Sequence, residues 1–186
     1  MNKWLILIMI ALHACCEGCC GFYTGIRGGT AILDDRVPGY DFDFDPCITV
    51  ALLAGYAPAS NWRIETQVGY LYSNMNDIKV DGDPTAVGGK AEIISTTINL
   101  ITLLPFNNKT ALSTGLGIGA KYEHLNLCGK NLPPIDFYET DFLYEIMVGV
   151  NRLFNRCWEV SLEYHLANPD ADLKSHSFTV NARRFF

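Results

Sequence analysis

The stretch CWEVSLEYHL at positions 157–166 alternates strictly between two kinds of side chain. Successive side chains of a β-strand point to opposite faces, so the stretch predicts a strand with one apolar and one polar face. The apolar face would carry Trp158, Val160, Leu162, Tyr164 and Leu166. The polar face would carry Cys157, Glu159, Ser161, Glu163 and His165.

Seven further segments of about ten residues show the same alternation, three of them with more noise. They are 22–30, 47–57, 62–72, 91–104, 110–125, 140–151 and 175–186. Together with 157–166 they give eight strands, and an even number lets an antiparallel barrel place both chain ends on one side.

The segments that join these strands alternate between short and long. The short connections are 58–61, 105–109 and 153–156, and the long ones are 31–46, 73–90, 126–139 and 167–174. Outer-membrane barrels have short periplasmic turns and longer outer loops, whereas a secreted β-sandwich has no reason to follow this rule. The sequence therefore predicts an all-β fold, a transmembrane antiparallel up-and-down β-barrel of eight strands.

Aromatic residues gather on the apolar faces, mostly near strand ends, as in the girdles that flank the apolar band of a membrane barrel. The predicted girdle consists of Trp62, Tyr70, Tyr72, Tyr122, Tyr144, Trp158 and Tyr164. Strands of about 9–11 residues are long enough to cross the hydrocarbon when tilted.

The N-terminus has the pattern of a secretory signal peptide. Lys3 supplies a positive charge, and the apolar run 4–14 is too short to span a bilayer as a helix. We expect residues 1–20 to be a cleaved signal peptide and 21–186 to form the barrel domain. An uncleaved anchor and a lipidated Cys15 are the alternatives.

Cleavage after residue 20 would leave three cysteines, Cys47, Cys128 and Cys157. Cys47 and Cys128 both fall near the predicted outer rim, so a disulfide between them is compatible with this topology. The cysteines lack the paired spacing of a zinc site, and we expect no metal or other cofactor.

The chain ends on Phe186, after a last strand whose apolar spacing is interrupted by Arg184. A terminal aromatic at the end of a strand resembles the signal by which outer-membrane barrels are recognised for assembly. The segments 21–25 (GFYTG) and 172–177 (DLKSHS) resemble the small OmpA-like and OmpX-like outer-membrane barrel proteins. The resemblance implies a surface antigen, adhesin, evasion factor or structural protein, and in some members an enzyme.

The inward faces of the predicted strands carry charges of both signs. They are Arg27, Arg63, Glu65, Lys121, Glu123, Glu145, Glu159, Glu163 and Arg183. An eight-stranded barrel is just wide enough to be filled by its own side chains, so these charges should pair into a structural network. The alternative is a narrow channel for ions or small solutes through the same groups, with Gly115, Gly117 and Gly119 leaving space along the wall.

The first long connection, 31–46, is acidic and carries the aromatic residues Tyr40, Phe42 and Phe44. Aromatic side chains on a polar loop are good anchors for a protein partner. Its aspartates could hold calcium, but a solvated loop of repelling charges is the simpler interpretation.

A net charge of −6 argues against nucleic acid as a partner. The segment 163–168 loosely resembles the active-site segment of outer-membrane lipid A deacylases, but Ala167 stands where the serine nucleophile would be. We therefore expect no catalytic residues. The predicted function is a non-enzymatic, monomeric barrel in contact with membrane lipid and the barrel assembly machinery, whose outer loops serve interaction, adhesion or antigenic display toward an extracellular or host protein. The narrow channel is the alternative, and a lipid A-modifying hydrolase is the third hypothesis.

Overall fold

The computed structural model describes residues 21–35, 40–80, 83–84, 87–129, 132–155, 157–168 and 173–186, and nearly all of them lie in strands. The predicted signal peptide, 1–20, lies outside the described residues. Within them, no helix has the length and hydropathy needed to cross a membrane. The strands are β1 (Gly21–Asp35), β2 (Tyr40–Phe44), β3 (Cys47–Ala59), β4 (Trp62–Val80), β5 (Asp83–Pro84), β6 (Val87–Asn107), β7 (Thr110–Gly129), β8 (Leu132–Asn155), β9 (Trp158–Ala167) and β10 (Leu173–Phe185).

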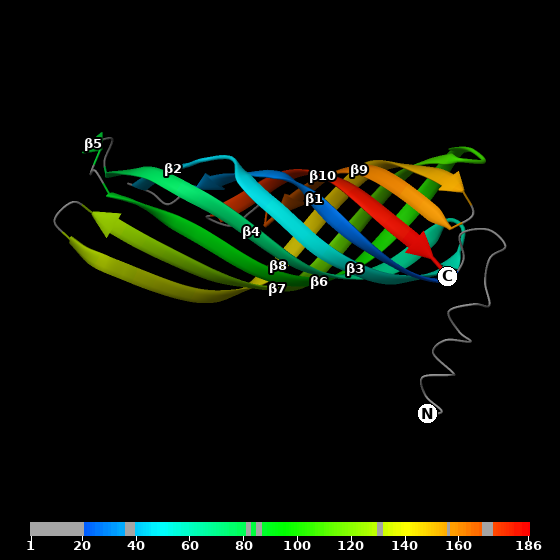
Figure 1. Cartoon of the computed structure of the whole chain (residues 1–186), viewed down its shortest axis with the longest axis horizontal. Helices are drawn as coiled ribbons and strands as arrows, with labels where there is room; N and C mark the ends of the chain where they lie inside the picture. The colour runs from blue at the N-terminus through cyan, green and yellow to red at the C-terminus, as the bar shows by residue number, and fades with distance from the viewer. Residues whose placement is uncertain are drawn as a thin grey trace, which may run out of the picture.

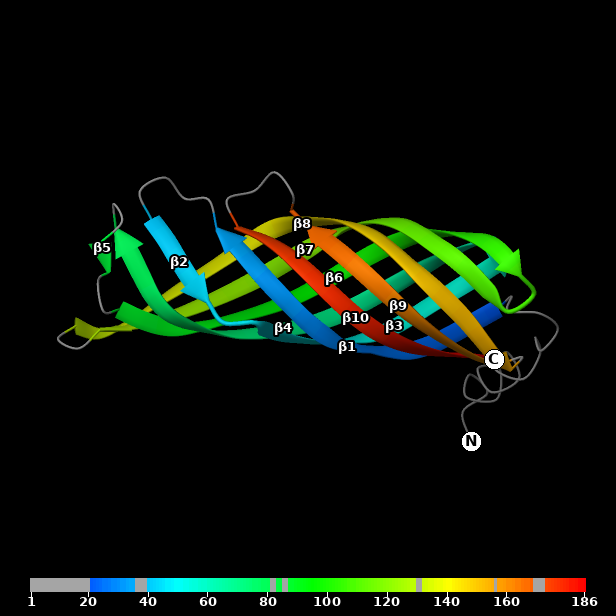
Figure 2. The same ribbon diagram turned by 90° about the horizontal axis from the view of Figure 1, so that it is seen from above.

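Eight long strands form a closed antiparallel ring (Figures 1 and 2). Around the ring the order is β1, β3, β4, β6, β7, β8, β9 and β10, so each strand pairs with its neighbours along the chain. The ring closes where β1 meets β10, in a continuous register from Tyr23↔Phe185 to Asp35↔Leu173. The predicted eight-stranded up-and-down barrel is confirmed.

Three tight turns lie at the same end as the start of β1 and the end of β10 (Figure 2). At two of them an asparagine fixes the turn. The Asn107 side-chain oxygen accepts from the backbone N–H groups of Lys109 and Thr110, both at 2.9 Å. Asn155 accepts in the same way from Cys157 and Trp158, both at 2.9 Å. Such side-chain bonds close a turn at the spacing observed here.

The strands run further outward than the sequence predicted. The segments 73–90 and 126–139 were predicted as loops, and this is wrong, because their backbones stay paired through Met75↔Gly89 and Asn126↔Asp136. The acidic connection 31–46 is also partly strand, since β2 pairs with β4. Alternating polarity marks a strand only where its two faces differ, and residues 135–140 of β8 are exposed on both faces, so no such pattern marks them.

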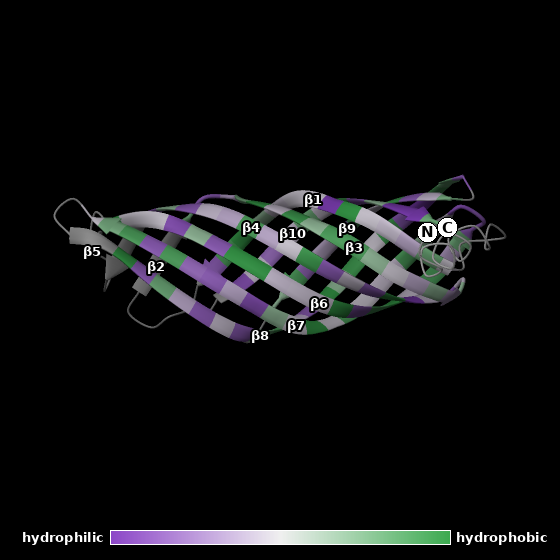
Figure 3. Ribbon diagram, turned by 60° about the horizontal axis from the view of Figure 1, so that its bottom comes forward, coloured by the Kyte–Doolittle hydropathy of each residue, from purple (hydrophilic) through white to green (hydrophobic). Residues whose placement is uncertain are grey.

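The two faces of the ring differ in polarity, which gives the alternation of green and purple along each strand in Figure 3. The outward side chains include exposed apolar residues such as Ile26, Leu52, Leu116 and Leu162. Such a surface would be unfavourable in water but matches a hydrocarbon surrounding.

All seven residues of the predicted aromatic girdle lie on the outer face, at two levels. Trp62 and Trp158 lie beside the tight turns, at the start of β4 and β9. Of the girdle residues on β4, Tyr72 lies furthest from the tight turns. Ten residues at about 3.3 Å each, tilted by about 40°, separate Trp62 from Tyr72 by about 25 Å along the barrel axis. This is about the height of the apolar band of an outer-membrane barrel.

The close approach of neighbouring strands predicts different effects of adding a side chain at two glycines. A Cβ at Gly119 would collide with the backbone carbonyl of Thr96, whereas a Cβ at Gly28 would meet nothing within 4 Å. We expect Gly119→Val to remove or strongly weaken the SDS-resistant folded form, because backbone on the neighbouring strand cannot yield as a side chain can. Gly28→Val should keep that form. Gel mobility with and without boiling measures both, and equal behaviour of the two variants would contradict the register.

Candidate functional site

Every one of the nine charged residues predicted to face the lumen is buried inside the ring, with no more than 7% of its surface exposed. In the lower half, toward the tight turns, they form a network of ion pairs. Arg183 lies at its centre, with Nε 2.7 Å from Glu65 Oε2 and Nη1 2.9 Å from Glu163 Oε1. The same guanidinium is 3.6 Å from Glu159. One arginine thereby connects β10 to β4 and β9.

Two further arginines extend the network. Arg63 donates to Glu159 Oε1 at 2.8 Å and to the side-chain oxygen of Asn151 at 3.1 Å. Arg27 lies 3.5 Å from Glu163 and 3.9 Å from Glu65. Because these groups are removed from water, each depends on its partners for the stability of its charge.

Neutral polar residues complete the network, and the sequence prediction did not include them. Ser161 accepts from Arg183 at 2.7 Å and from Asn181 at 3.0 Å, and donates to Glu163 at 2.8 Å. Strand parity could have found them, because they occupy the inward positions of β9 and β10 between the charges. Below the network, Tyr23, Ala57 and Phe185 form an apolar cluster at the turn end.

Lys121, Glu123 and Glu145 lie further outward than this network. Lys121 Nζ is 2.6 Å from Glu123 and 3.8 Å from Asp141. The carboxylates of Glu123, Glu139 and Asp141 come within 4.8 Å of one another, a spacing suited to a metal ion. The ammonium of Lys121 supplies the positive charge at this place, so the cluster does not require a metal ion.

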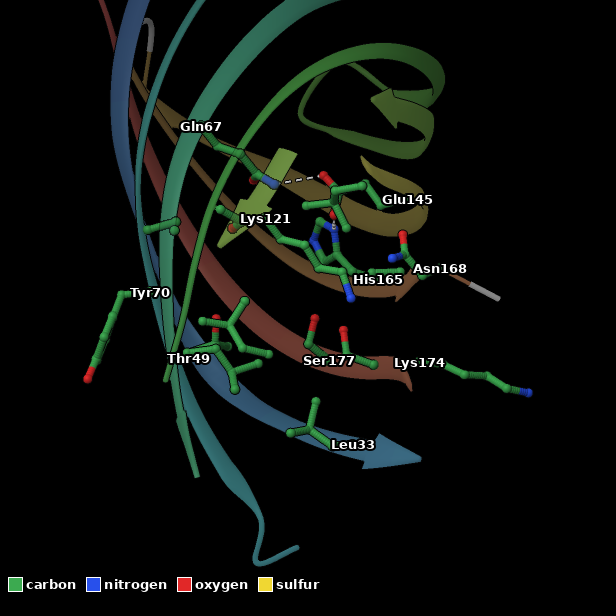
Figure 4. A pocket seen from close by; sticks show the side chains of 18 of the residues that line it. Leu33, Thr49, Gln67, Tyr70, Lys121, Glu145, His165, Asn168, Lys174 and Ser177 are labelled. Carbon is green, nitrogen blue, oxygen red and sulfur yellow. Dashed lines mark hydrogen bonds and ion pairs between the residues drawn. The ribbon is translucent and has the colours of Figure 1, made fainter. Parts of the chain in front are cut away.

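A recess of about 750 Å³, the open space at its mouth included, lies on the outer side of the ion-pair network. All eight ring strands contribute to its lining. Figure 4 shows Gln67, Glu145 and His165 close together, while Leu33 and Lys174 lie further along the recess. The His165 ring lies between two carboxylates, 3.3 Å from Glu145 and 3.2 Å from Glu163.

Beyond the recess, the described part of the wall has no strand beside the outer half of β8. β8 pairs with β7 from Leu132 onward, but its pairing with β9 begins only at Glu145↔Ala167. Asn168, with φ 48°, ends this ladder: its backbone N–H donates to the Tyr144 carbonyl, and its side-chain oxygen accepts from the Tyr144 N–H. The outer parts of β2, β4, β6, β7 and β8 therefore form an open sheet, here called the protruding sheet (Figure 1).

The outer edge strand of the protruding sheet exposes large side chains on both of its faces. Residues 135–140 are all exposed, and Ile135, Phe137 and Tyr138 are its large apolar members. The backbone groups of Tyr144 point toward β9, so by strand period those of Asp136, Tyr138 and Thr140 point to the same side. Within the described residues no strand pairs with them there.

A polar cluster fixes the outer face of the protruding sheet. The ring of His124 is 3.1 Å from Asp136 and 3.3 Å from Glu92, and it stacks on Tyr138 with centroids 4.6 Å apart. The hydrogen bond with Asp136, and then that with Glu92, raises the pKa of His124. Hydrogen bonds from Asn126, and then from His124, lower the pKa of Asp136. Glu92 lies opposite Tyr72 in the strand register, so the cluster begins at the outermost girdle tyrosines, and it favours a positively charged His124 between two carboxylates.

Of the three aromatic anchors predicted in 31–46, the structure describes the side chain of one. Tyr40 and Phe42 lie in β2, but their side chains lie outside the described part of the structure. Phe44 is half-buried and packs against the inner cluster of Ala31, Leu33, Cys47 and Ala91, so it is not a freely projecting side chain.

The structure also bears on the remaining sequence hypotheses. Cys47 is buried and Cys128 is exposed, and no disulfide joins them. His176 lies on the outer face, where it is 2.7 Å from the Tyr164 hydroxyl.

Comparison with known proteins identifies a family and several proteins with a similar fold. The sequence matches the family described as outer membrane protein beta-barrel domain over residues 7–186. No curated protein sequence matches it. Neisserial surface protein A is similar in structure, with 15% identity, a TM-score of 0.64, and coverage of 91% of this chain and 100% of the other.

Two further solved structures are similar. Ail, the attachment invasion locus protein of Yersinia pestis, in complex with the heparin analogue sucrose octasulfate, has 16% identity and a TM-score of 0.61, covering 89% of this chain and 97% of Ail. OprG from Pseudomonas aeruginosa has 14% identity and a TM-score of 0.58, covering 91% and 99%. At these identities the likeness concerns the fold.

The network predicts that two neighbouring arginines differ in their contribution to stability. Arg183→Met leaves Glu65 and Glu163 buried without their closest guanidinium, and breaking a buried pair costs about 3–5 kcal/mol. We expect the free energy of unfolding to fall by about that amount. Arg184→Met, on the exposed outer face, should cost about 1 kcal/mol or less. Urea unfolding in phospholipid vesicles, read as the folded fraction on unboiled gels, measures both. Equal losses would show that the lumen pairs do not stabilise the barrel.

Proposed function

The chain belongs to the family of outer membrane protein β-barrel domains, and from this premise we propose that its protruding sheet binds an extracellular protein. The family and the similar structures make it a barrel of the bacterial outer membrane. In this proposal the barrel is a non-enzymatic anchor, and the strands that extend beyond it present the binding surface.

The unpaired edge of β8 is the observation that carries this proposal. Six backbone groups, the N–H and C=O of Asp136, Tyr138 and Thr140, point within the sheet away from β7. They have no strand partner among the described residues. An exposed strand edge is a template on which an extended segment of another protein can add as a further strand. The opposite edge of β8 is paired with β7, and this pairing holds the free edge in an extended conformation.

Side chains next to this edge would give the binding its selectivity. Phe137 is 52% and Tyr138 is 61% exposed, and aromatic side chains are frequent anchors in protein interfaces. Asp136, Glu139 and Asp141 give the same strand an acidic character. This favours a partner segment with basic and apolar residues. Ail was crystallised with a strongly anionic heparin analogue, and the acidic strand here does not favour such a ligand.

Export and assembly follow the expectations from the sequence. We propose that residues 1–20 are removed as a signal peptide, that Phe186 contributes to recognition by the barrel assembly machinery, and that the barrel is a monomer. Phe186 is well placed for this role at the end of the last strand, where its N–H donates to the carbonyl of Phe22 across the ring closure at 2.9 Å.

Strand addition predicts a specific effect of proline at Thr140. The Thr140 N–H faces the free edge, so Thr140→Pro removes one donor of the template without breaking the β7–β8 ladder. We expect an alternating Thr-Val decapeptide to slow amide hydrogen exchange at Asp136, Tyr138 and Thr140 in the intact barrel. Thr140→Pro should weaken peptide binding about tenfold.

The matched control is Thr140→Val, which keeps the N–H and the strand propensity. It should bind the peptide as the unsubstituted protein does. Protection at other amides, or equal binding by the proline variant, would rule out strand addition at β8.

The channel hypothesis makes a separate prediction in planar bilayers. If the buried charges serve only structure, Glu145→Gln and Glu159→Gln should leave conductance unchanged, while Glu159→Gln should lower the urea midpoint by removing a partner of Arg63. A conductance that changes with either substitution would favour the narrow channel over the structural network.

A further inference from the structure

The recess on the outer side of the ion-pair network has the shape of a small-molecule site. Small side chains leave its middle open: Ala51, Gly69, Ser95, Ala167 and Ser177 line it from five different strands. Apolar side chains line it further outward: Leu33, Leu71, Ile93 and Leu143. A recess with apolar walls and a few converging polar groups is typical of a ligand site, and its small enclosed part suits a ligand of only a few heavy atoms.

The polar end of the recess carries an uncompensated negative charge. Leaving aside the Lys121–Glu123 pair, the described lumen holds four carboxylates, the network members Glu65, Glu159 and Glu163 and the more outward Glu145, against three guanidiniums, Arg27, Arg63 and Arg183. Every carboxylate of this set except Glu145 lies within 4.0 Å of an arginine in the described structure. Glu145 is 5% exposed and accepts hydrogen bonds from the neutral groups of Gln67 at 2.7 Å and Thr97 at 3.3 Å, and His165 Nδ1 lies 3.3 Å from it.

A second acceptor beside Glu145 is unpartnered. Gln67 donates its amide N–H to Glu145, and this fixes which end of the amide is nitrogen. Its oxygen, Oε1, is buried and accepts no hydrogen bond within the described structure. A buried acceptor without a donor is costly, so this end of the recess presents two acceptors that need a donor or a cation.

His165 is the side chain that could supply a charge to Glu145, and it is shared. Only a protonated ring can donate to Glu145 and Glu163 together, and Nδ1 makes no hydrogen bond of good geometry despite its 3.3 Å approach to Glu145. The other cationic groups that line the recess are Lys121 of β7, Arg27 of β1 and Lys174 of β10, which lie beside Glu123, Glu163 and Asp34 respectively.

We propose that the recess binds a small primary amine with a short apolar tail. The ammonium group would lie against Glu145 and the Gln67 oxygen, and the tail would lie among Leu33, Leu71, Ile93 and Leu143. An ammonium offers three donors and one positive charge, which would satisfy the Gln67 oxygen and balance the surplus carboxylate of Glu145. This site lies inside the barrel and is independent of strand addition at the β8 edge.

The test uses the full barrel in nanodiscs of zwitterionic lipid, with n-butylamine as the probe and n-butanol and butyrate as matched neutral and anionic probes. Chemical shifts of the Leu33 and Leu143 methyls and of the Gln67 amide report on the recess. The titration is run at pH 8, where an alkyl amine is protonated and a carboxylic acid is ionised in water. We expect saturable shifts with butylamine and at least tenfold weaker binding of butanol and butyrate.

Glu145→Gln keeps the shape of the side chain and should weaken butylamine binding at least tenfold. Glu92→Gln makes the same change of charge on the outer face and should leave it unchanged. Ser177→Leu fills the recess without touching Glu145 and should abolish binding, while the folded fraction on unboiled gels verifies each variant. Equal binding of butanol, unchanged binding by Glu145→Gln, or the absence of saturable shifts at the recess would each overturn the proposal.

Discussion

Backbone hydrogen bonding between β1 and β10 is the constraint on which the rest of this structure depends. In hydrocarbon each unpaired N–H or C=O costs several kcal/mol, so strands can span a membrane only if the sheet has no edge. The pairing of Tyr23 with Phe185, and of the twelve following positions up to Asp35 with Leu173, removes the two edges that the meander would otherwise have. Closure also fixes which side chains face inward, and thereby confines nine charged residues to a narrow lumen.

The confined charges explain why the lower lumen is filled and the upper lumen is not. Around Arg183 the partners approach within 2.7–2.9 Å, which is the geometry that desolvated charges require. Further outward the inward positions change to glycine, alanine and serine, and the ring encloses space instead of side chains. Glu145 lies at the boundary, in reach of the space but not of an arginine. The size and charge of the inward side chains at each level of the lumen therefore decide whether that level is filled by ion pairs or left open as a recess.

The sequence alone predicted the ring, its strand number and the set of inward charges, because inside a membrane the two faces of a strand must differ in polarity. In β9 the alternation from Trp158 to Leu166 is complete, and the strand bounds came within one residue. The same criterion failed for β8, where 132–139 carries Ile135, Phe137 and Tyr138 on a strand wet on both faces. There the strand is specified by pairing with β7, which no local pattern reveals. The recess was also beyond the sequence, since it arises from small residues on five strands that only the register brings together.

Strand length connects the two surfaces that this chain offers to its surroundings. β8 has 24 residues and β9 has 10, and Asn168 ends their common ladder in a left-handed turn that asparagine adopts at little cost. If β9 continued beside β8, it would pair the edge at Asp136, Tyr138 and Thr140 and extend the wall around the recess. Within the described residues the short β9 therefore leaves the edge of β8 unpaired, and Ala167 and Asn168, where β9 ends, line the recess. Both features lie outward of the Arg183 network, so they can vary in sequence without disturbing the closed ring that anchors them.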